Sequence, residues 1–489
     1  MRMTTSLSVC PKYPMAFDLV IRNATVIDGT RAPRFAADIA IRDGRIAAIG
    51  RVDEKAKNEI NARGKIAAPG FIDAHTHDDR LMLSSPDMAP KVSQGVTTVV
   101  AGNCGISLAP APKGMRAPVA VPLDLLDDEG GWFRYKTFKE YVDALRSQPA
   151  ATNCALLVGH SMLRVQTMDS TSRPATREEI KNMRAMVEEA MEAGALGLST
   201  GLYYEPANAA PTEEVIELCR PLAERNGIYC THMRNEGEHI LDSLEETFRV
   251  GREANVPVVI SHHKVAGKPN HGRSAETLPV IAKAMREQRV ALDCYPYHAS
   301  STILSASRVA NATKVLVTWS KPHPEAAGMD LEEIKNKLNL SVEDLLPAGA
   351  IYFSMDEKDV QRILGFERTM IGSDGLPHDD APHPRLWGTF PRVLGHYSRT
   401  VGLFPLETAV HKMTGLTART FGLTDRGVLA KGYAADIVIF SAEEVDEAAS
   451  FSKPIQAAKG IDTVLVNGET VWRDGRPSGA RPGRVLSRQ

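Results

Sequence analysis

Histidine and cysteine side chains stand at the ends of short apolar runs, where they could bind a metal ion. His75 and His77 close the run 70–77, and Cys104 follows the run 96–102 among glycines. Imidazole nitrogen and thiolate sulfur are ligands of Zn2+, which in a catalytic site keeps one position open for water. Each residue also has a plain structural explanation, because paired histidines can be hydrogen-bonded at a strand end and a free cysteine is more often a small buried hydrophobe.

The same kinds of donor end three later apolar runs. They are His232, His262 and Asp374, which lie near the ends of the runs 228–234, 256–264 and 369–375. Each of them alone would also suit the polar capping of a strand end. Together with the earlier residues they supply the nitrogen, sulfur and oxygen ligands of a zinc centre. The pattern as a whole predicts a zinc site, held by the set of residues and not by any single one.

Eight apolar runs alternate with helical patterns through the middle of the chain. The runs are 70–77, 96–102, 153–160, 196–202, 228–234, 256–264, 290–297 and 369–375. Eight strands that alternate with helices over roughly 350 residues predict an α/β fold, the (β/α)8 TIM barrel, whose active site lies at the carboxyl ends of the strands. An insertion at about 301–348 is expected to interrupt the last units.

Strand patterns that alternate between apolar and polar residues flank this region on both sides. Residues 18–28 alternate around β-branched side chains, the dipeptide Asp43-Gly44 predicts a hairpin turn between short antiparallel strands, and similar runs return near the carboxyl end. We expect both termini to build one small β-sandwich. The predicted division is a disordered lead-in at 1–16, sandwich parts at 17–68 and 420–489, and the barrel at 69–419.

Composition and charge exclude several classes of protein. The 489 residues carry 58 Lys and Arg against 60 Asp and Glu, for a formal net charge of -2. Such a chain has no global basic field for nucleic acid, and no stretch approaches the roughly 18 apolar residues of a membrane helix. Six scattered cysteines without a CxxC pair, and a polar start without a signal-peptide core, favour the cytoplasm.

A set of longer motifs spans nearly the whole chain. They are Ala68-Pro-Gly-Phe-Ile-Asp-Ala-His75-Thr-His77, Gly102-Asn-Cys104-Gly105, Thr231-His232-Met-Arg234, Ser261-His262-His263-Lys264, Asp293-Cys-Tyr295-Pro-Tyr297 with Ser300-Ser301-Thr302, and Gly372-Ser-Asp374-Gly375 with His383-Pro-Arg385. Through them the sequence resembles the amidohydrolase superfamily and, within it, the N-acyl-D-amino-acid deacylases (D-aminoacylases). The resemblance implies a TIM barrel with a small β-domain from both termini, in agreement with the predicted division.

The resemblance also implies two groups of metal ligands. A tightly bound zinc ion would be held by Cys104, His232 and His262, and a second, weak or vacant position would lie beside His75, His77 and Asp374. Binuclear members of the superfamily carry a bridging carboxylated lysine on the fourth strand, but 196–206 contains no lysine, so the Cys104 thiolate must take over. The number of metals stays open. The motif selects His262 over His263, which we expect to pack against the outer layer of the barrel.

Asp374 is the expected general base, which would accept a proton from the attacking water and pass it to the leaving amine. The substrate's α-carboxylate suits the planar guanidinium of Arg385, with Lys264, Tyr295 and Ser301 as further donors at positions to which the resemblance also points. For Lys264 and Tyr295, a solvated or packed residue at a strand end is an equally open interpretation.

We therefore predict zinc-dependent hydrolysis of the amide bond of N-acyl-D-amino acids, and the D configuration depends wholly on the resemblance. Arg308, if its loop folds over the site, would favour N-acyl-D-glutamate or N-acyl-D-aspartate, although a loop arginine is more often solvated. One alternative is a cyclic-amide hydrolase of the hydantoinase or dihydroorotase kind, which would require the missing lysine. Another is a catalytically silent barrel that serves as a scaffold. The sequence does not indicate an oligomeric state.

Overall fold

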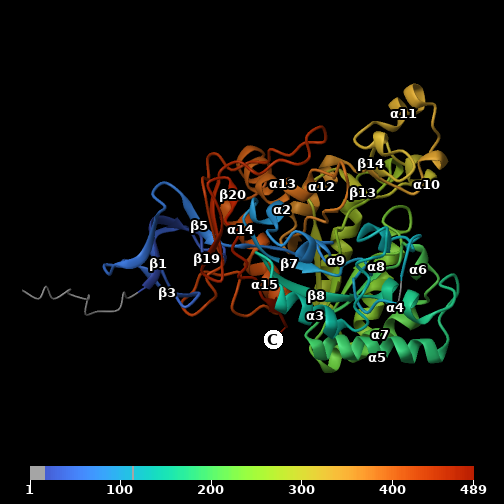
Figure 1. Cartoon of the computed structure of the whole chain (residues 1–489), viewed down its shortest axis with the longest axis horizontal. Helices are drawn as coiled ribbons and strands as arrows, with labels where there is room; N and C mark the ends of the chain where they lie inside the picture. The colour runs from blue at the N-terminus through green and yellow to red at the C-terminus, as the bar shows by residue number, and fades with distance from the viewer. Residues whose placement is uncertain (1–16, 113–114, 489) are drawn as a thin grey trace, which may run out of the picture.

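The computed structural model describes residues 17–112 and 115–488, and its centre is a barrel of eight parallel strands (Figure 1). The barrel strands in chain order are β6 (Phe71–Asp73), β7 (Val96–Ala101), β8 (Asn153–Gly159), β9 (Gly197–Gly201), β10 (Ile228–His232), β11 (Val258–Ile260), β12 (Val290–Cys294) and β16 (Thr369–Ile371). The backbone N–H of Ala74 donates to the carbonyl of Ile371 (3.1 Å), and that of Asp374 donates to the carbonyl of His75 (2.8 Å). These bonds join β6 to β16, so the predicted TIM barrel is confirmed.

Helices cover the outside of the barrel. The principal ones are α3 (Phe138–Ser147), α4 (His160–Thr167), α5 (Arg177–Ala193), α7 (Thr212–Glu224), α8 (Ile240–Ala254), α9 (Ser274–Glu287), α12 (Glu357–Gly365), α13 (Arg385–Arg392), α14 (Leu406–Met413) and α15 (Gly415–Phe421). Because helices pack on the outer face and side chains fill the interior, all six residues of β7 are buried. This burial on both faces explains why the barrel strands are continuous apolar runs in the sequence.

The barrel strands end earlier than the sequence predicts. β6 ends at Asp73 and β11 at Ile260, so His75, His77 and His262 lie in the loops that follow. Loop backbone, and not the pleat of a strand, directs these side chains.

A second sheet combines strands from both terminal regions of the chain. Its strands are β1 (Phe17–Val26), β2 (Phe35–Arg42), β3 (Arg45–Gly50), β4 (Ala56–Asn61), β5 (Ile66–Pro69), β17 (Ile437–Phe440), β18 (Ile461–Val466), β19 (Glu469–Arg473) and β20 (Arg476–Pro477). In Figure 1 the blue strands β1 and β5 lie near the red strand β19. Antiparallel β5 and β17 join the two halves, and Ile21 and Ile39 share one core with Ile437 and Ile439. The small β-domain has strands from both termini, as predicted, but β1 pairs in parallel with β4 and β5.

A three-stranded antiparallel sheet interrupts the barrel between β12 and β16. It consists of β13 (Ala299–Ile303), β14 (Val315–Ser320) and β15 (Ala348–Phe353), and it carries α10 (Ala306–Val309) and α11 (Leu331–Leu338). The inserted subdomain, 299–353, has a hydrophobic core of its own and stands at the upper right of Figure 1.

The predicted lead-in, 1–16, lies outside the described residues. Across the part of the chain that is described, no helix has both the length and the apolar character needed to cross a membrane.

Candidate metal centre and active site

All six predicted metal ligands converge at the carboxyl ends of the barrel strands. They form two overlapping groups, within each of which the donor atoms lie within 4.8 Å of one another: His75, His77, Cys104 and Asp374, and Cys104, His232 and His262. Sγ of Cys104 lies 3.3 Å from Nε2 of His75 and 3.3 Å from Nε2 of His262. Cys104 belongs to both groups, so the two groups share its sulfur.

Strained backbone turns three of these donors toward one another. Cys104, His262 and Asp374 have φ angles of 55°, 36° and 51°, in the left-handed region that residues with side chains seldom adopt. Such conformations cost of order 1–3 kcal/mol each and persist where the surrounding structure enforces them. Beside Cys104, a Cβ added to Gly102 would lie 2.0 Å from the carbonyl oxygen of Leu157, so the chain needs glycine there. Strain of this kind is a frequent feature of functional sites.

The charge states of Cys104 and His232 suit a metal. Burial would raise the pKa of the Cys104 thiol, but the neighbouring His75 and His262 lower it well below its ordinary value. Burial lowers the pKa of His232 well below its ordinary value, although Glu236 opposes the shift. Neither ring nitrogen of this neutral imidazole has a hydrogen-bond partner in the described structure. A thiolate and an imidazole with a free lone pair are what Zn2+ binds, so the residues present fit the predicted metal.

Asp374 lies between the ligand group and a buried arginine. Its Oδ1 is 3.2 Å from Nε2 of His77, and its Oδ2 is 2.8 Å from Nη1 of Arg385. Burial would raise the pKa of Asp374, but Arg385 and the nearby histidines hold it well below the ordinary value. The carboxylate is therefore ionised at neutral pH and can both bind a cation and accept a proton.

A small cavity opens onto the ligand groups. Lys264, Tyr295, Ser301 and Arg308, four of the predicted substrate-binding residues, line it. The Tyr295 hydroxyl and the Ser301 Oγ are buried without a hydrogen-bond partner among the described residues, so they are free to bind a ligand there.

Arg385 lies behind the wall of this cavity. Its Nη2 donates to the carbonyl of Ser301 (3.0 Å), Nη1 pairs with Asp374, and the guanidinium stacks 4.6 Å from the ring centroid of Tyr295. Nε and Nη1 have no hydrogen-bond partner among the described residues, so part of the planar fork that we expect to bind a substrate carboxylate is not engaged by hydrogen bonds.

Arg308 of α10 lines both this cavity and a wider one beside it. Its guanidinium lies 4.1 Å from the ring centroid of Tyr203. No carboxylate within the described ranges forms an ion pair with it. The half-buried guanidinium of Arg308 therefore has no ion-pair partner among the described residues and is accessible to a ligand in the cavity.

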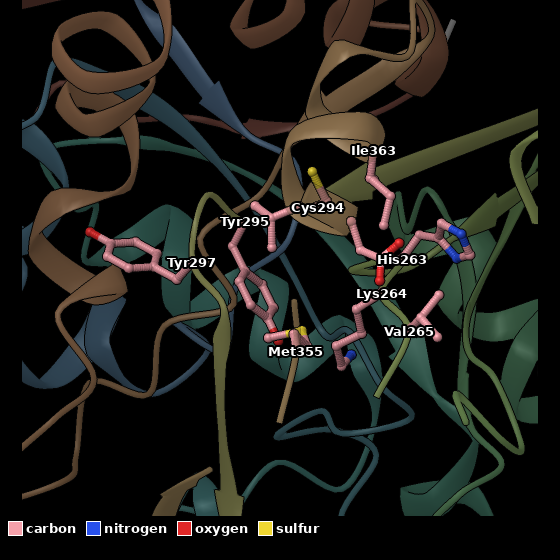
Figure 2. A pocket seen from close by; sticks show the side chains of 10 residues that line it. His263, Lys264, Val265, Cys294, Tyr295, Tyr297, Met355 and Ile363 are labelled. Carbon is pink, nitrogen blue, oxygen red and sulfur yellow. The ribbon is translucent and has the colours of Figure 1, made fainter. Parts of the chain in front are cut away.

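Figure 2 shows a second, smaller cavity, which shares Lys264 and Tyr295 with the cavity at the ligand groups. The ring of His263 extends away from the Lys264 side chain. Its Nε2 lies 3.0 Å from Oγ1 of Thr277 in α9. The expected outward packing of His263 is therefore confirmed.

Sequence reasoning missed two carboxylates of the site, Glu236 and Asp293. Glu236 contacts Lys264 and the two histidines of the second ligand group. Asp293, at the end of β12, accepts from the backbone N–H of His262 (2.9 Å) and lies 3.7 Å from Nδ1 of His75. The position of Asp293 at a strand end, inside one of the motifs, was a usable signal. Glu236 lies in a loop and offered none.

A buried lysine was also missed. Lys91 of α2 (Ala89–Val92) donates to Oδ2 of Asp73 (2.9 Å) and to Oγ of Ser373 (2.8 Å), and lies 3.3 Å from Asp78. Asp73 in turn accepts from the backbone N–H groups of His75 (3.3 Å) and Ser373 (2.7 Å). All of these side chains are buried. The network ties together the two loops that carry the histidine pair and Asp374.

Two family models and several known proteins match this chain. The amidohydrolase family model matches residues 58–324 and 367–472, and a model of the urease alpha-subunit N-terminal domain matches 1–66. A D-aminoacylase of Alcaligenes xylosoxydans xylosoxydans is 58% identical over 478 residues, 96% of this chain and 98% of the relative. An N-acyl-D-aspartate deacylase of the same organism is 51% identical over 99% of this chain and 97% of the relative.

Solved structures of deacylases are also similar to this chain. A D-aminoacylase structure, described in terms of a binuclear centre with one-metal activation and second-metal attenuation, has a TM-score of 0.94 at 57% identity and covers 96% of this chain and 100% of its own. An N-acyl-D-glutamate deacylase from Bordetella bronchiseptica, in complex with zinc and a phosphonate mimic of the tetrahedral intermediate, has a TM-score of 0.92 at 45% identity, with coverage of 96% and 99%. A D-hydantoinase at 16% identity and a TM-score of 0.59, covering 97% of this chain and 99% of its own, shares the fold alone. This chain belongs to the amidohydrolase family and, within it, to the N-acyl-D-amino-acid deacylases.

Proposed function

We propose that this protein hydrolyses the amide bond of N-acyl-D-amino acids to a carboxylate and a free D-amino acid, with Zn2+ as its metal. The observation that carries the proposal is the buried Cys104, whose sulfur is shared by two groups of metal-ligating side chains, one of which includes Asp374. Neighbouring positive groups lower the pKa of Cys104 and of Asp374, which supports their ionised forms. When bound, zinc would lower the pKa of a water molecule to about 7 and polarise the amide carbonyl. The high identity to enzymes of this activity supports the D configuration of the substrate.

The protein's own residues would orient the substrate and move the proton. Asp374 would accept a proton from the attacking water and give it to the leaving nitrogen. Its lowered pKa favours the ionised carboxylate, the form that can accept this proton. Lys264, the Tyr295 hydroxyl and Ser301 would hold the α-carboxylate, because they line the cavity beside the ligands. Arg385 would hold the Asp374 carboxylate in place through their buried ion pair.

We further propose that Cys104, His232 and His262 hold one zinc ion tightly, while a second metal beside His75, His77 and Asp374 is weak or absent. The neutral, unpartnered imidazole of His232 supports a strong site in the first group. In the second group the Asp374 carboxylate is already engaged by Arg385, which weakens its hold on a cation. The related D-aminoacylase, described as activated by one metal and attenuated by a second, is consistent with this division.

The side-chain preference is proposed to depend on Arg308. The relatives include enzymes named for N-acyl-D-aspartate and N-acyl-D-glutamate. A guanidinium without a counter-charge at the edge of the cavity would attract a second carboxylate of the substrate. We therefore favour acidic substrates over apolar ones.

We also propose a cytoplasmic location. The five cysteines of the described residues are all free and buried, as is usual in a reducing compartment. Cell fractionation with a cytoplasmic marker enzyme checks this.

The test is amine release from paired N-acetyl-D and N-acetyl-L forms of glutamate, aspartate, leucine and methionine, with zinc measured on the same sample. We expect turnover of D forms alone and at least one zinc ion per chain. Turnover of the L forms, or no turnover with zinc present, would reject the proposed substrate. An inactive protein that retains no zinc would instead support the alternative that the barrel is catalytically silent and serves as a scaffold.

A further inference from the structure

Glu236 is a buried carboxylate in the loop after β10, and it contacts three polar side chains at once. Its Oε1 lies 2.7 Å from Nζ of Lys264 and 3.1 Å from Nδ1 of His262, and its Oε2 lies 3.5 Å from Nε2 of His232. The side chain is only 6% exposed. A buried carboxylate must be compensated, so its position is fixed by these three partners.

We propose that Glu236 is a positioning residue that orients both histidines of the Cys104 group for one metal ion. The inference rests on the metal centre of the proposed function and adds to it the group that sets the direction of its ligands. Glu236 itself does not lie in either ligand group. A single carboxylate has two oxygens, and here one faces each imidazole.

For His262 the reason is the position of the ring proton. Nε2 of this imidazole faces Sγ of Cys104 at 3.3 Å and is the nitrogen available to the shared metal. A neutral histidine that binds a metal through Nε2 carries its proton on Nδ1, which then needs an acceptor. Nζ of Lys264 lies 2.8 Å from Nδ1 and its ammonium group can only donate, so in this structure it hydrogen-bonds to Nδ1 without its proton. Once the proton is on Nδ1, Oε1 of Glu236, 3.1 Å away, is the acceptor within reach.

For His232 the same carboxylate faces the opposite nitrogen. Nε2 lies 3.5 Å from Oε2 of Glu236 without a hydrogen bond, and neither ring nitrogen of His232 has a hydrogen-bond partner among the described residues. A proton held on Nε2 by Glu236 would leave the Nδ1 lone pair free for the metal. The two histidines would thus present different nitrogens to one ion, because one carboxylate lies between their distal nitrogens.

Lys264 connects this arrangement to the substrate. Figure 2 shows its side chain beside Tyr295, and Nζ lies 5.8 Å from that ring's centroid. Glu236 and Lys264 both line the cavity that opens onto the ligands. Glu236 therefore also restrains the ammonium group proposed to bind the substrate's α-carboxylate, so a plain alternative is that it only neutralises Lys264.

The experiment measures zinc affinity of the full-length apoprotein by competition with a chromophoric chelator, without an activity assay. We expect Glu236→Gln to weaken zinc binding by about 10- to 100-fold, the usual effect of removing a carboxylate behind a histidine ligand. Glu238→Gln is the matched control, because it removes the same charge from an exposed position of the same loop and should leave the affinity unchanged. An affinity of Glu236→Gln within threefold of the wild type would overturn the inference.

The double variant Glu236→Gln/Lys264→Met separates orientation from charge neutralisation. It leaves neither charge unpaired, so it also guards against misfolding of the single variant. We expect its zinc affinity to stay as weak as that of Glu236→Gln, with Lys264→Met alone close to wild type. Recovery of wild-type affinity in the double variant would show that Glu236 serves only as a counter-charge. Failure of the wild type to bind zinc would reject the proposed metal centre itself.

Discussion

Asp374 can serve both a metal ion and a proton transfer because its two carboxylate oxygens face different partners. Oδ1 faces His77 and the ligand group, while Oδ2 is paired with Arg385. The ion pair keeps the carboxylate charged inside the protein, where burial alone would favour the neutral acid.

Asp374→Asn removes the proton acceptor and keeps the shape. We expect kcat to fall by about 10²- to 10⁴-fold, the usual contribution of a general base. The measurement is kcat for an N-acetyl-D-amino acid, with zinc content determined on the same sample. Asp380→Asn, at an exposed position of the same loop, is the control and should keep wild-type kcat. A fully zinc-loaded Asp374→Asn enzyme within tenfold of the wild type would contradict this role.

Arg308→Leu tests the side-chain preference. We expect kcat/KM for N-acetyl-D-glutamate to fall at least about tenfold, because a desolvated charge pair is lost, while the value for N-acetyl-D-methionine changes little. The ratio of the two values in each protein is the quantity to measure. An equal loss for both substrates would mean that Arg308 only shapes the cavity.

Among the elements, the short helix α2 holds two strand ends together. Lys91 lies between Asp73 and Asp78 and also donates to Ser373, so it bridges the loops after β6 and β16. The buried ammonium group of Lys91 neutralises two buried carboxylates. Removal of the lysine or of a carboxylate would therefore leave buried charge without its partner and destabilise the protein.

Lys91→Met should therefore lower stability by about 3–5 kcal/mol, the usual cost of breaking a buried ion pair from one side. The matched control is Lys139→Met, which removes an exposed pair with Asp143 on α3 and should cost at most about 0.5 kcal/mol. Thermal midpoints of the three proteins compare these effects. Equal midpoints for Lys91→Met and the wild type would show that the buried network contributes no stability.

Helices α4 and α7 are joined by Glu214, which contacts His160 and Arg164 inside the protein. Burial would raise the pKa of Glu214, but His160 and Arg164 lower it from 4.5 to about 2. For an acid with a lowered pKa, the stabilisation is complete above 4.5 and is lost as the pH falls toward 2.

The difference in thermal midpoint between the wild type and Glu214→Gln should consequently be largest at neutral pH and narrow as the pH falls from 4.5 toward 2. Melting curves of the two proteins at several pH values give this difference. If the difference in thermal midpoint stays constant as the pH falls from 4.5 to 2, ionisation of Glu214 does not stabilise the protein.

Sequence reasoning located the elements better than the side chains. The eight runs were recognisable because barrel strands are buried on both faces, and the six metal ligands because they follow strand ends. Glu236 and Lys91 were not recognisable, since one lies in a loop and the other on a four-residue helix, and only tertiary packing brings them to the site. The parallel pairing of β1 with β4 likewise depends on a long-range contact that no local pattern encodes.

For the whole molecule, three units of one chain surround the site. The barrel supplies the ligands, the inserted subdomain supplies Ser301 and Arg308 to the cavity wall, and the sheet from both termini leads through β5 directly into β6. Arg385, in the first turn of α13, reaches back to the Ser301 carbonyl and so joins the inserted subdomain to the barrel.

The measurement that tests the central claim most directly is a zinc titration of chelator-treated protein, assayed with paired N-acetyl-D and N-acetyl-L substrates. We expect no turnover without metal and a rise in D-amino acid release up to one equivalent of zinc, with no further rise beyond it. The thermal midpoint should increase in parallel, because a metal that binds only the folded state stabilises it. Full activity of the metal-free protein, or turnover of the L substrate alone, would contradict the assignment of a metal-dependent N-acyl-D-amino-acid deacylase.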